Sequence, residues 1–199
     1  MKFVAIAAAA ASLLTVSAQA QDVPGGTYNL DPTHTTVVFG VSHVGFSLYR
    51  GTLNDVSGSL SWDAADPTKS SLTVSIGADS VHSPAAVSHA DNANFQEDIA
   101  KLALGSETQD TITFTSTTLR RTGEDKGVMV GELSFNGQTH PIEMVVELTG
   151  AGEFFGSPRL GFSGEATIDR TQWGSDAWTQ FGVGTEVVIE VEAEFGLAQ

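Results

Sequence analysis

Apolar and polar residues alternate along most of the chain after its first twenty residues, which is the pattern of half-buried β-strands. The last apolar stretch shows it best, because Val187, Ile189 and Val191 alternate with Glu190 and Glu192. Antiparallel sheets with one dry face and one solvated face produce this pattern. The alternation predicts eight strands, at residues 35–43, 50–62, 70–78, 111–119, 128–135, 139–148, 160–168 and 186–195.

The dipeptide Asn136-Gly137 separates two of these strands and is a preferred sequence for a tight type I′ turn. On the strand that follows, Ile142 and Met144 share one face, so the hairpin should have a dry side and a largely wet side. We therefore predict a β-hairpin over residues 128–148.

The first strand of this hairpin changes phase along its length. Val128 and Val130 are out of step with Leu133 and Phe135. One extra residue in a strand shifts the face that its side chains occupy. A bulge near residues 131–132 is therefore expected.

One segment departs from the β pattern. Phe95, Ile99 and Leu102 recur at the spacing of one helix face. Asn94 is suited to accept a backbone hydrogen bond at the start of a helix, and Gly105 can adopt the left-handed conformation that often ends one. The pattern predicts a short, lid-like helix from residue 94 to residue 104.

Eight antiparallel strands with one apolar face can form a two-sheet sandwich or a closed barrel, and connections of hairpin length favour the barrel. A barrel of eight strands is either filled by its own side chains or holds one small ligand. Small residues at inward positions favour internal space, whereas large aromatic residues there would fill it. The small residues are Gly58, Ser116, Gly164, Ala166 and Ala193, and the aromatic residues are Phe39, Trp62, Phe114 and Phe162.

The chain carries 24 acidic and 9 basic residues, for a net charge of −15 at pH 7. Nucleic acids and anionic membranes are bound by clustered Lys and Arg, and Arg120-Arg121 is the one such cluster. We therefore expect no nucleic-acid partner and no stable membrane insertion. The absence of cysteine excludes disulfides, thiol catalysis and thiolate metal sites.

The N-terminus has the features of an export signal. Lys2 precedes an apolar run over residues 3–16, and Ala18 and Ala20 form a small-x-small cleavage site. We expect a signal peptide at residues 1–20, a mature chain that begins at Gln21 and a single barrel domain at residues 21–199. The alternative is an N-terminal anchor that is not cleaved.

The sequence gives only weak evidence for a catalytic or metal-binding site. The densest group of potential ligands, Asp79, His82, His89 and Asp91, has no compact ligand spacing and lies in a predicted loop. Ser88 beside His89 does not indicate a catalytic triad, because no Gly-x-Ser-x-Gly motif occurs. We expect no metal, no cofactor and no catalysis.

The adjacent Asp169 and Arg170 are interpreted as an exposed ion pair or one at the barrel rim, because isolated surface pairs of this kind are common. The remaining acidic residues lie mostly on outward strand positions, where solvation explains them better than paired acid–base chemistry does. These charged residues therefore give no reason to predict an enzymatic function.

Several motifs in the mature chain resemble the YceI-like proteins, which are also called polyisoprenoid-binding or periplasmic lipid-binding proteins. The resemblance implies a lipocalin-like barrel whose lumen binds a long isoprenoid or another amphiphile in the periplasm of a Gram-negative bacterium. The chain departs from the family in residues 91–110, which lack the usual proline, so the contacts at the pocket mouth stay open. The matching motifs are residues 30–34, 38–39, 42–43, 51–60, 112–117, 131–142, 168–170 and 173–174.

Inward parity and the resemblance together indicate a set of ligand-binding residues. The set is Phe39, Val41, His43, Leu60, Val74, Ile76, Phe95, Ile99, Ile112, Phe114, Met144, Val146, Phe162, Ala166, Ile189 and Ala193.

Selectivity for a polar headgroup should come from His43, Tyr49 or Ser116, although a lone histidine in a barrel wall, such as His43, is more often a structural donor than a ligand contact. The main functional hypothesis is therefore a lipid binder or carrier. The alternative is a stress-related or redox-partner protein that acts through protein interaction. The sequence leaves open whether the chain forms a homodimer.

Overall fold

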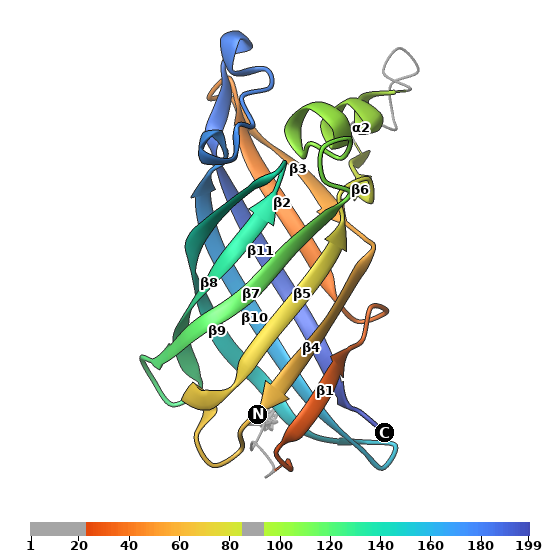
Figure 1. Cartoon of the computed structure of the whole chain (residues 1–199), viewed down its shortest axis with the longest axis vertical. Coiled ribbons are helices and arrows are strands. Elements are labelled where there is room, and N and C mark those ends of the chain that lie inside the picture. Colours follow the sequence, from red (N-terminus) through yellow and green to blue (C-terminus); the bar gives the residue numbers. More distant parts are fainter. Residues whose placement is uncertain (1–22, 85–93) are drawn as a thin grey trace, which may run out of the picture.

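The computed structural model describes residues 23–84 and 94–199. The predicted signal peptide, together with Ser88, His89 and Asp91, lies outside these ranges. The described strands form one antiparallel sheet (Figure 1). They are β1 (Gly26–Leu30), β2 (Thr36–His43), β3 (Ser47–Leu53), β4 (Val56–Trp62), β5 (Ser71–Gly77), β6 (Val81–His82), β7 (Thr111–Arg121), β8 (Lys126–Phe135), β9 (Gln138–Phe154), β10 (Ser157–Asp169) and β11 (Val183–Leu197).

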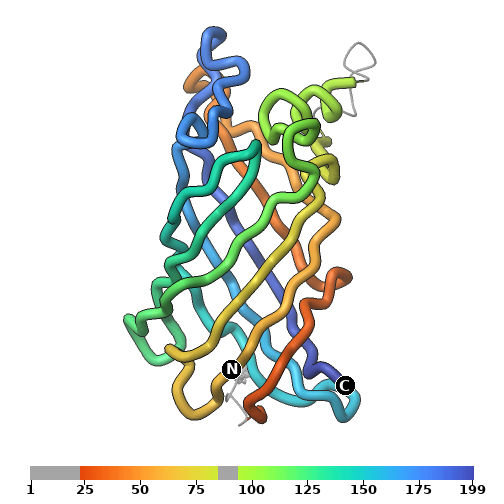
Figure 2. The backbone as a smooth tube through the Cα atoms, viewed as in Figure 1, coloured from red at the N-terminus to blue at the C-terminus, as the bar shows by residue number. Residues whose placement is uncertain are grey.

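The sheet closes on itself. The order β1-β4-β5-β7-β8-β9-β10-β11 returns to β1, because the last strand pairs with the first at Leu30 and Phe195. These eight strands confirm the predicted antiparallel barrel. The remaining strands, β2, β3 and β6, continue from β11, whose first half pairs with β2. Figure 2 shows the backbone as a tube, with the strands inclined around the barrel.

The strand boundaries differ from the prediction in several places, and β9 continues past the predicted end at residue 148 to Phe154. Residues 50–62 do not form one strand but are divided between β3 and β4 at Asn54-Asp55. The division occurs because β3 pairs with β2 and β6, whereas β4 pairs with β1 and β5. The short β1 and β6 were not predicted, because runs of five and two residues are too short for a clear alternation.

The predicted hairpin is present. Asn136 and Gly137 have φ angles of 49° and 72°, both positive as a type I′ turn requires, and Phe135 pairs with Gln138. The predicted bulge near residues 131–132 is wrong. The register shift instead lies on the neighbouring β7, between Ser116 and Thr118.

The phase of β8 explains the error. Met129, Leu133 and Phe135 are all buried, and Gly131 keeps the same parity, so this strand is continuous. Its inward positions are the odd-numbered ones. Val128 faces the other side and is only half-buried, so its apolar character was misleading.

The predicted helix is present but changes type. It comprises α2 (Phe95–Asp98) and the π-helical turn η3 (Ile99–Ala103), in which the Leu104 N–H donates to the Ile99 carbonyl at 3.1 Å. A hydrogen bond in a π-helix spans five residues, whereas one in an α-helix spans four, so the side chains that follow are rotated around the helix axis. Leu102 is therefore 58% exposed, contrary to the prediction that it shares a face with Phe95 and Ile99.

The two predicted helix ends have different outcomes. Asn94 makes no side-chain capping hydrogen bond, so that prediction is wrong. Gly105 has a φ of 67°, as predicted, and a Cβ at this position would lie 2.0 Å from the Asn136 Oδ1 atom. Glycine is therefore required here for both conformation and space. None of the helices in the described ranges is long and apolar enough to cross a membrane.

Candidate ligand-binding cavity

The barrel encloses an apolar cavity of about 430 Å³. This volume lies within the range of about 300–1,000 Å³ that is usual for small-molecule sites. All of the residues predicted to bind ligand line the cavity except Ala166. Ala166 faces inward and is 4% exposed, but its single methyl group is packed within the wall.

Glycines on the inward side allow close packing by larger neighbours. A Cβ on Gly131 would lie 2.3 Å from the Phe114 Cζ atom, and one on Gly51 would lie 2.5 Å from the Phe39 Cζ atom. A Cβ on Gly164 would lie 2.9 Å from the Met144 sulfur. These glycines are therefore covered by neighbouring side chains, and the cavity is the space that those side chains leave.

The lining of the cavity extends to the end of the barrel that carries α2, because it includes Phe95 of α2 and Ile99 of η3. Figure 1 shows α2 at the upper end of the barrel. Two of its lining residues are exposed, and both lie at this end: His43, which ends β2, and Phe181, which ends the 3-10 turn η5 (Thr179–Phe181). We call this end the mouth. Because His43 lies at the mouth, it is not a buried structural donor.

Three aromatic rings lie just inside the mouth. Tyr49 and Phe95 pack edge to face with ring centroids 6.0 Å apart, and Phe95 and Trp178 are 5.4 Å apart. Sequence reasoning missed Trp178 and Phe181, because the glycine-rich segment 171–184 shows no periodicity and was interpreted as a loop. Aromatic residues within that loop were the available signal.

Two polar groups in the cavity wall have no hydrogen-bond partner among the described residues. They are the Tyr49 hydroxyl, near the mouth, and the indole N–H of Trp62, which ends β4 at the opposite end of the barrel. Such groups are rare in folded proteins, because leaving them unpaired costs free energy. The Ser116 hydroxyl, predicted as a third candidate, instead accepts a hydrogen bond from the Leu72 N–H at 2.8 Å and does not line the cavity.

Arg170 holds the loop that forms one side of the mouth. Its guanidinium is buried and donates to the backbone carbonyls of Gly184, Ser175 and Ala177, at 3.0, 2.9 and 2.8 Å. Burial lowers the pKa of Arg170 below its ordinary value. Because its donors are directed to the loop, Arg170 acts as a structural support rather than as an anion site.

The predicted ion pair between Asp169 and Arg170 is not formed. The Asp169 carboxylate instead caps the 3-10 turn η4 (Arg170–Trp173), where it accepts from the Thr171 N–H at 3.0 Å and the Thr171 hydroxyl at 2.7 Å. These hydrogen bonds lower the pKa of Asp169. A local cap is favoured here because Thr171 is two residues away, whereas Arg170 points into the loop.

Residues 28–195 match the family model described as the YceI-like domain. The chain belongs to the YceI-like family. A "UPF0312 protein" of Pseudomonas fluorescens is 31% identical to it over 171 residues, which cover 83% of this chain and 85% of the relative. The resemblance of the sequence motifs to the YceI-like family is therefore confirmed.

Solved structures share the YceI-like fold at lower identity. The BcnA protein of Burkholderia cenocepacia superposes with a TM-score of 0.70 at 18% identity, covering 83% of this chain and 98% of BcnA. A polyisoprenoid-binding domain from Saccharophagus degradans, implicated in plant cell wall breakdown, gives a TM-score of 0.64 at 15% identity, with coverage of 86% and 98%. These similarities establish the barrel fold.

The family motif at residues 173–174 is structural in this YceI-like chain. Trp173 is 1% exposed, stacks on Phe135 with ring centroids 5.2 Å apart and donates its indole N–H to the Leu133 carbonyl at 3.0 Å. His140 packs edge to face against the same ring. The motif therefore anchors η4 to the β8–β9 hairpin and does not line the cavity.

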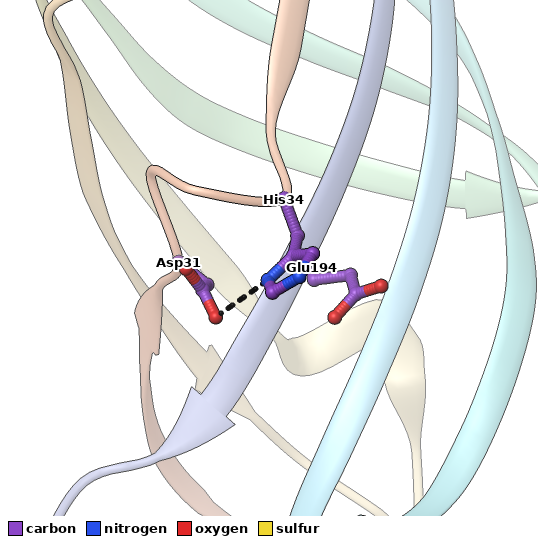
Figure 3. Close-up of side chains that lie close together, drawn as sticks. All are labelled: Asp31, His34 and Glu194. Atoms are coloured by element: carbon purple, nitrogen blue, oxygen red, sulfur yellow. Dashed lines mark hydrogen bonds and ion pairs between the residues drawn. The ribbon is translucent and has the colours of Figure 1, made fainter.

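The motif at residues 30–34 forms a polar cluster outside the lumen (Figure 3). Ligand atoms of Asp31, His34 and Glu194 lie within 4.8 Å of one another. Asp31, however, already accepts hydrogen bonds from Thr33 (2.6 Å), Arg159 (2.9 Å) and His34 (3.1 Å), and the Thr33 bond in particular holds the pKa of Asp31 well below its usual range. These hydrogen bonds hold the turn between β1 and β2. We call Asp31 and its three hydrogen-bond partners the clamp.

Proposed function

We propose that this YceI-like protein binds a long-chain isoprenoid or another amphipathic lipid in its barrel lumen and carries or sequesters it without catalysis. The observation that carries the proposal is the apolar cavity of about 430 Å³, whose two exposed lining residues both lie at the mouth, with an unpaired hydroxyl near that mouth. The structural neighbour from Saccharophagus degradans, named as a polyisoprenoid-binding domain, supports the same ligand class. We further propose that the protein acts in the periplasm after removal of residues 1–20.

Burial of the hydrocarbon tail would provide most of the affinity. Each buried methylene contributes about 0.8 kcal/mol, so ten of them contribute about 8 kcal/mol before the cost of ordering a flexible chain. Apolar walls discriminate poorly between tails of similar size. The polar end of the ligand must therefore determine much of the selectivity.

Tyr49 is the group best placed to bind that polar end. Its hydroxyl lies near the mouth, so a ligand that enters tail-first leaves its headgroup beside it. The tail would then extend along the lumen toward Trp62. Arg170 is not expected to bind an anionic headgroup, because its N–H groups already donate to loop carbonyls.

The direct test is native mass spectrometry of protein purified from its own host. We expect a long-chain amphiphile bound in a one-to-one ratio, which organic extraction should release. Protein that is repeatedly recovered empty and also fails to bind prenyl compounds would contradict the proposal. It would favour the alternative of a protein-interaction role.

A variant that fills the lumen provides a second test. Ala193 is buried and lines the cavity, so Ala193→Trp should abolish uptake of ligand while β-type circular dichroism is retained. The matched control is Val145→Trp, because Val145 is 57% exposed on the outer face of β9. Unchanged binding by a folded Ala193→Trp protein would place the site outside the lumen.

A further inference from the structure

Two segments that are far apart in the sequence meet beside the mouth. The tip of the β2–β3 hairpin lies against the loop that follows η5, and the Val44 N–H donates to the Gly182 carbonyl at 3.1 Å. Figure 1 shows the orange hairpin tip and the blue loop together at the upper end of the barrel. A Cβ on Gly182 would lie 3.4 Å from the Val44 Cγ1 atom, so the two segments are in contact at the mouth.

This surface is apolar and exposed. Phe46 is 89% exposed, Phe181 69%, Leu48 52% and Val44 44%. We call these four residues the apolar rim. Large apolar side chains gathered at one place on a soluble protein commonly mark an interaction site.

The rim is also free of charge. Segments 42–49 and 177–185 contain no Asp, Glu, Lys or Arg, although the chain has 24 acidic and 9 basic residues. The opposite end of the barrel differs. There the exposed Phe154 and Phe155 lie at the β9–β10 turn between Glu153 and Arg159. The uncharged stretch is therefore longer at the rim than at the β9–β10 turn, where it covers only residues 154–158.

We propose that the apolar rim docks transiently onto the surface of an uncharged or zwitterionic lipid bilayer, with the cavity mouth facing the headgroup layer. This inference rests on the proposed function, because a lipid ligand that leaves a bilayer must cross water unless the mouth meets the membrane. Aromatic side chains are favoured at the membrane interface, and charged groups are disfavoured in it. The net charge of −15 excludes a strongly anionic surface.

The size of the rim argues against a second copy of the chain as its partner. Stable protein–protein interfaces use about 20–30 residues on each side. The rim has four, and the helix on the other side of the mouth carries the charged Glu97, Asp98 and Lys101. A bilayer, by contrast, can accept a few protruding apolar side chains without a matching shape.

The experiment is flotation of the purified mature protein with phosphatidylcholine vesicles. Wild-type protein should bind, and the bound fraction should not fall at high salt, because no ion pairs are involved. The double variant Phe46→Ser/Leu48→Ser should bind at least about tenfold more weakly, given the transfer free energies of these side chains. The matched control Phe154→Ser/Phe155→Ser, whose residues are at least as exposed in sum, should bind like wild type.

Three results would overturn the docking proposal. They are a wild-type protein that does not float, equal binding by the two double variants, and stronger binding when phosphatidylglycerol replaces phosphatidylcholine. Sedimentation that shows a wild-type dimer dissociated by Phe46→Ser/Leu48→Ser, without vesicle binding, would instead assign the rim to a second copy.

Binding of farnesol without vesicles separates this proposal from the proposed function. None of Phe46, Leu48, Phe154 and Phe155 lines the cavity, so both double variants should bind farnesol as wild type does. If wild-type protein binds vesicles through the rim but takes up no prenyl compound, the proposed function fails and the docking surface stands. If it takes up farnesol but ignores vesicles, only the docking proposal fails.

Discussion

Tyr49 and Ser116 are two single residues whose hydroxyl groups have different roles in the structure. Both were expected at the polar end of the site. The Ser116 hydroxyl is used by the strand ladder, because it accepts from the Leu72 backbone, whereas the Tyr49 hydroxyl has no partner among the described residues. A buried hydroxyl without a partner is available to a ligand.

Replacing Tyr49 tests this assignment. Tyr49→Phe should weaken binding of a prenyl alcohol by about three- to tenfold, the value of one hydrogen bond, and leave binding of a hydrocarbon of equal length unchanged. Isothermal titration with both ligands measures the difference. The control is Trp62→Phe, which removes the other unpaired donor in the cavity wall but should keep the preference for the alcohol. A Tyr49→Phe protein that still prefers the alcohol would remove Tyr49 from headgroup recognition.

The clamp around Asp31 gives a prediction about pH. The folded pKa of Asp31 lies below its unfolded value of 3.8, so its contribution to stability is fully present above that value and is lost as pH falls toward the folded pKa. The destabilisation caused by Asp31→Asn should therefore be larger at pH 7 than at pH 3 in urea unfolding. Asp66→Asn, at a more exposed turn, should show a smaller difference. A pH-independent effect would contradict the clamp.

At the scale of strands, the pairing of glycine with aromatic residues shapes the cavity wall. Gly131 on β8 lies under the ring of Phe114 on β7, next to the bulge between Ser116 and Thr118. Gly51 on β3 lies under Phe39 on β2 in the same way. These pairs keep large rings flat against the barrel wall, which leaves the lumen open.

Substitution of these glycines should therefore destabilise the barrel. In Gly131→Ala the new Cβ would approach both the Phe114 ring and the Thr115 carbonyl, at 2.3 and 2.7 Å, and the backbone atom cannot move freely. We expect a loss of about 1–3 kcal/mol in the free energy of unfolding. Gly150→Ala, with no atom within 4 Å of its Cβ, is the control. Equal stability of the two variants in denaturant melts would refute the packing role.

At the scale of the whole molecule, the ends of the described chain close the barrel. The first strand, β1, pairs with the last, β11, and Phe195 on that last strand is only 3% exposed. Val23, just before β1, is also buried. A complete barrel therefore needs the residues from about 23 onward, which is compatible with removal of residues 1–20.

Export can be tested on this basis. Protein recovered from the periplasm of an expressing Gram-negative cell should begin at Gln21, as determined by N-terminal sequencing or intact mass. Ala18→Phe should block processing, because the cleavage site requires small residues. An unprocessed wild-type chain in the membrane fraction would favour the uncleaved anchor.

Local patterns in the sequence predicted the all-β class and the Asn136-Gly137 hairpin, and all but one of the proposed ligand-binding residues line the cavity. These succeeded because alternation along a strand is a property of neighbouring residues. The tertiary structure alone decided the division of residues 50–62, the bulge on β7 and the position of the mouth. Each depends on register between segments that are distant in the sequence. The same holds for Tyr49, whose free hydroxyl could be distinguished from that of Ser116 only once the strands were paired.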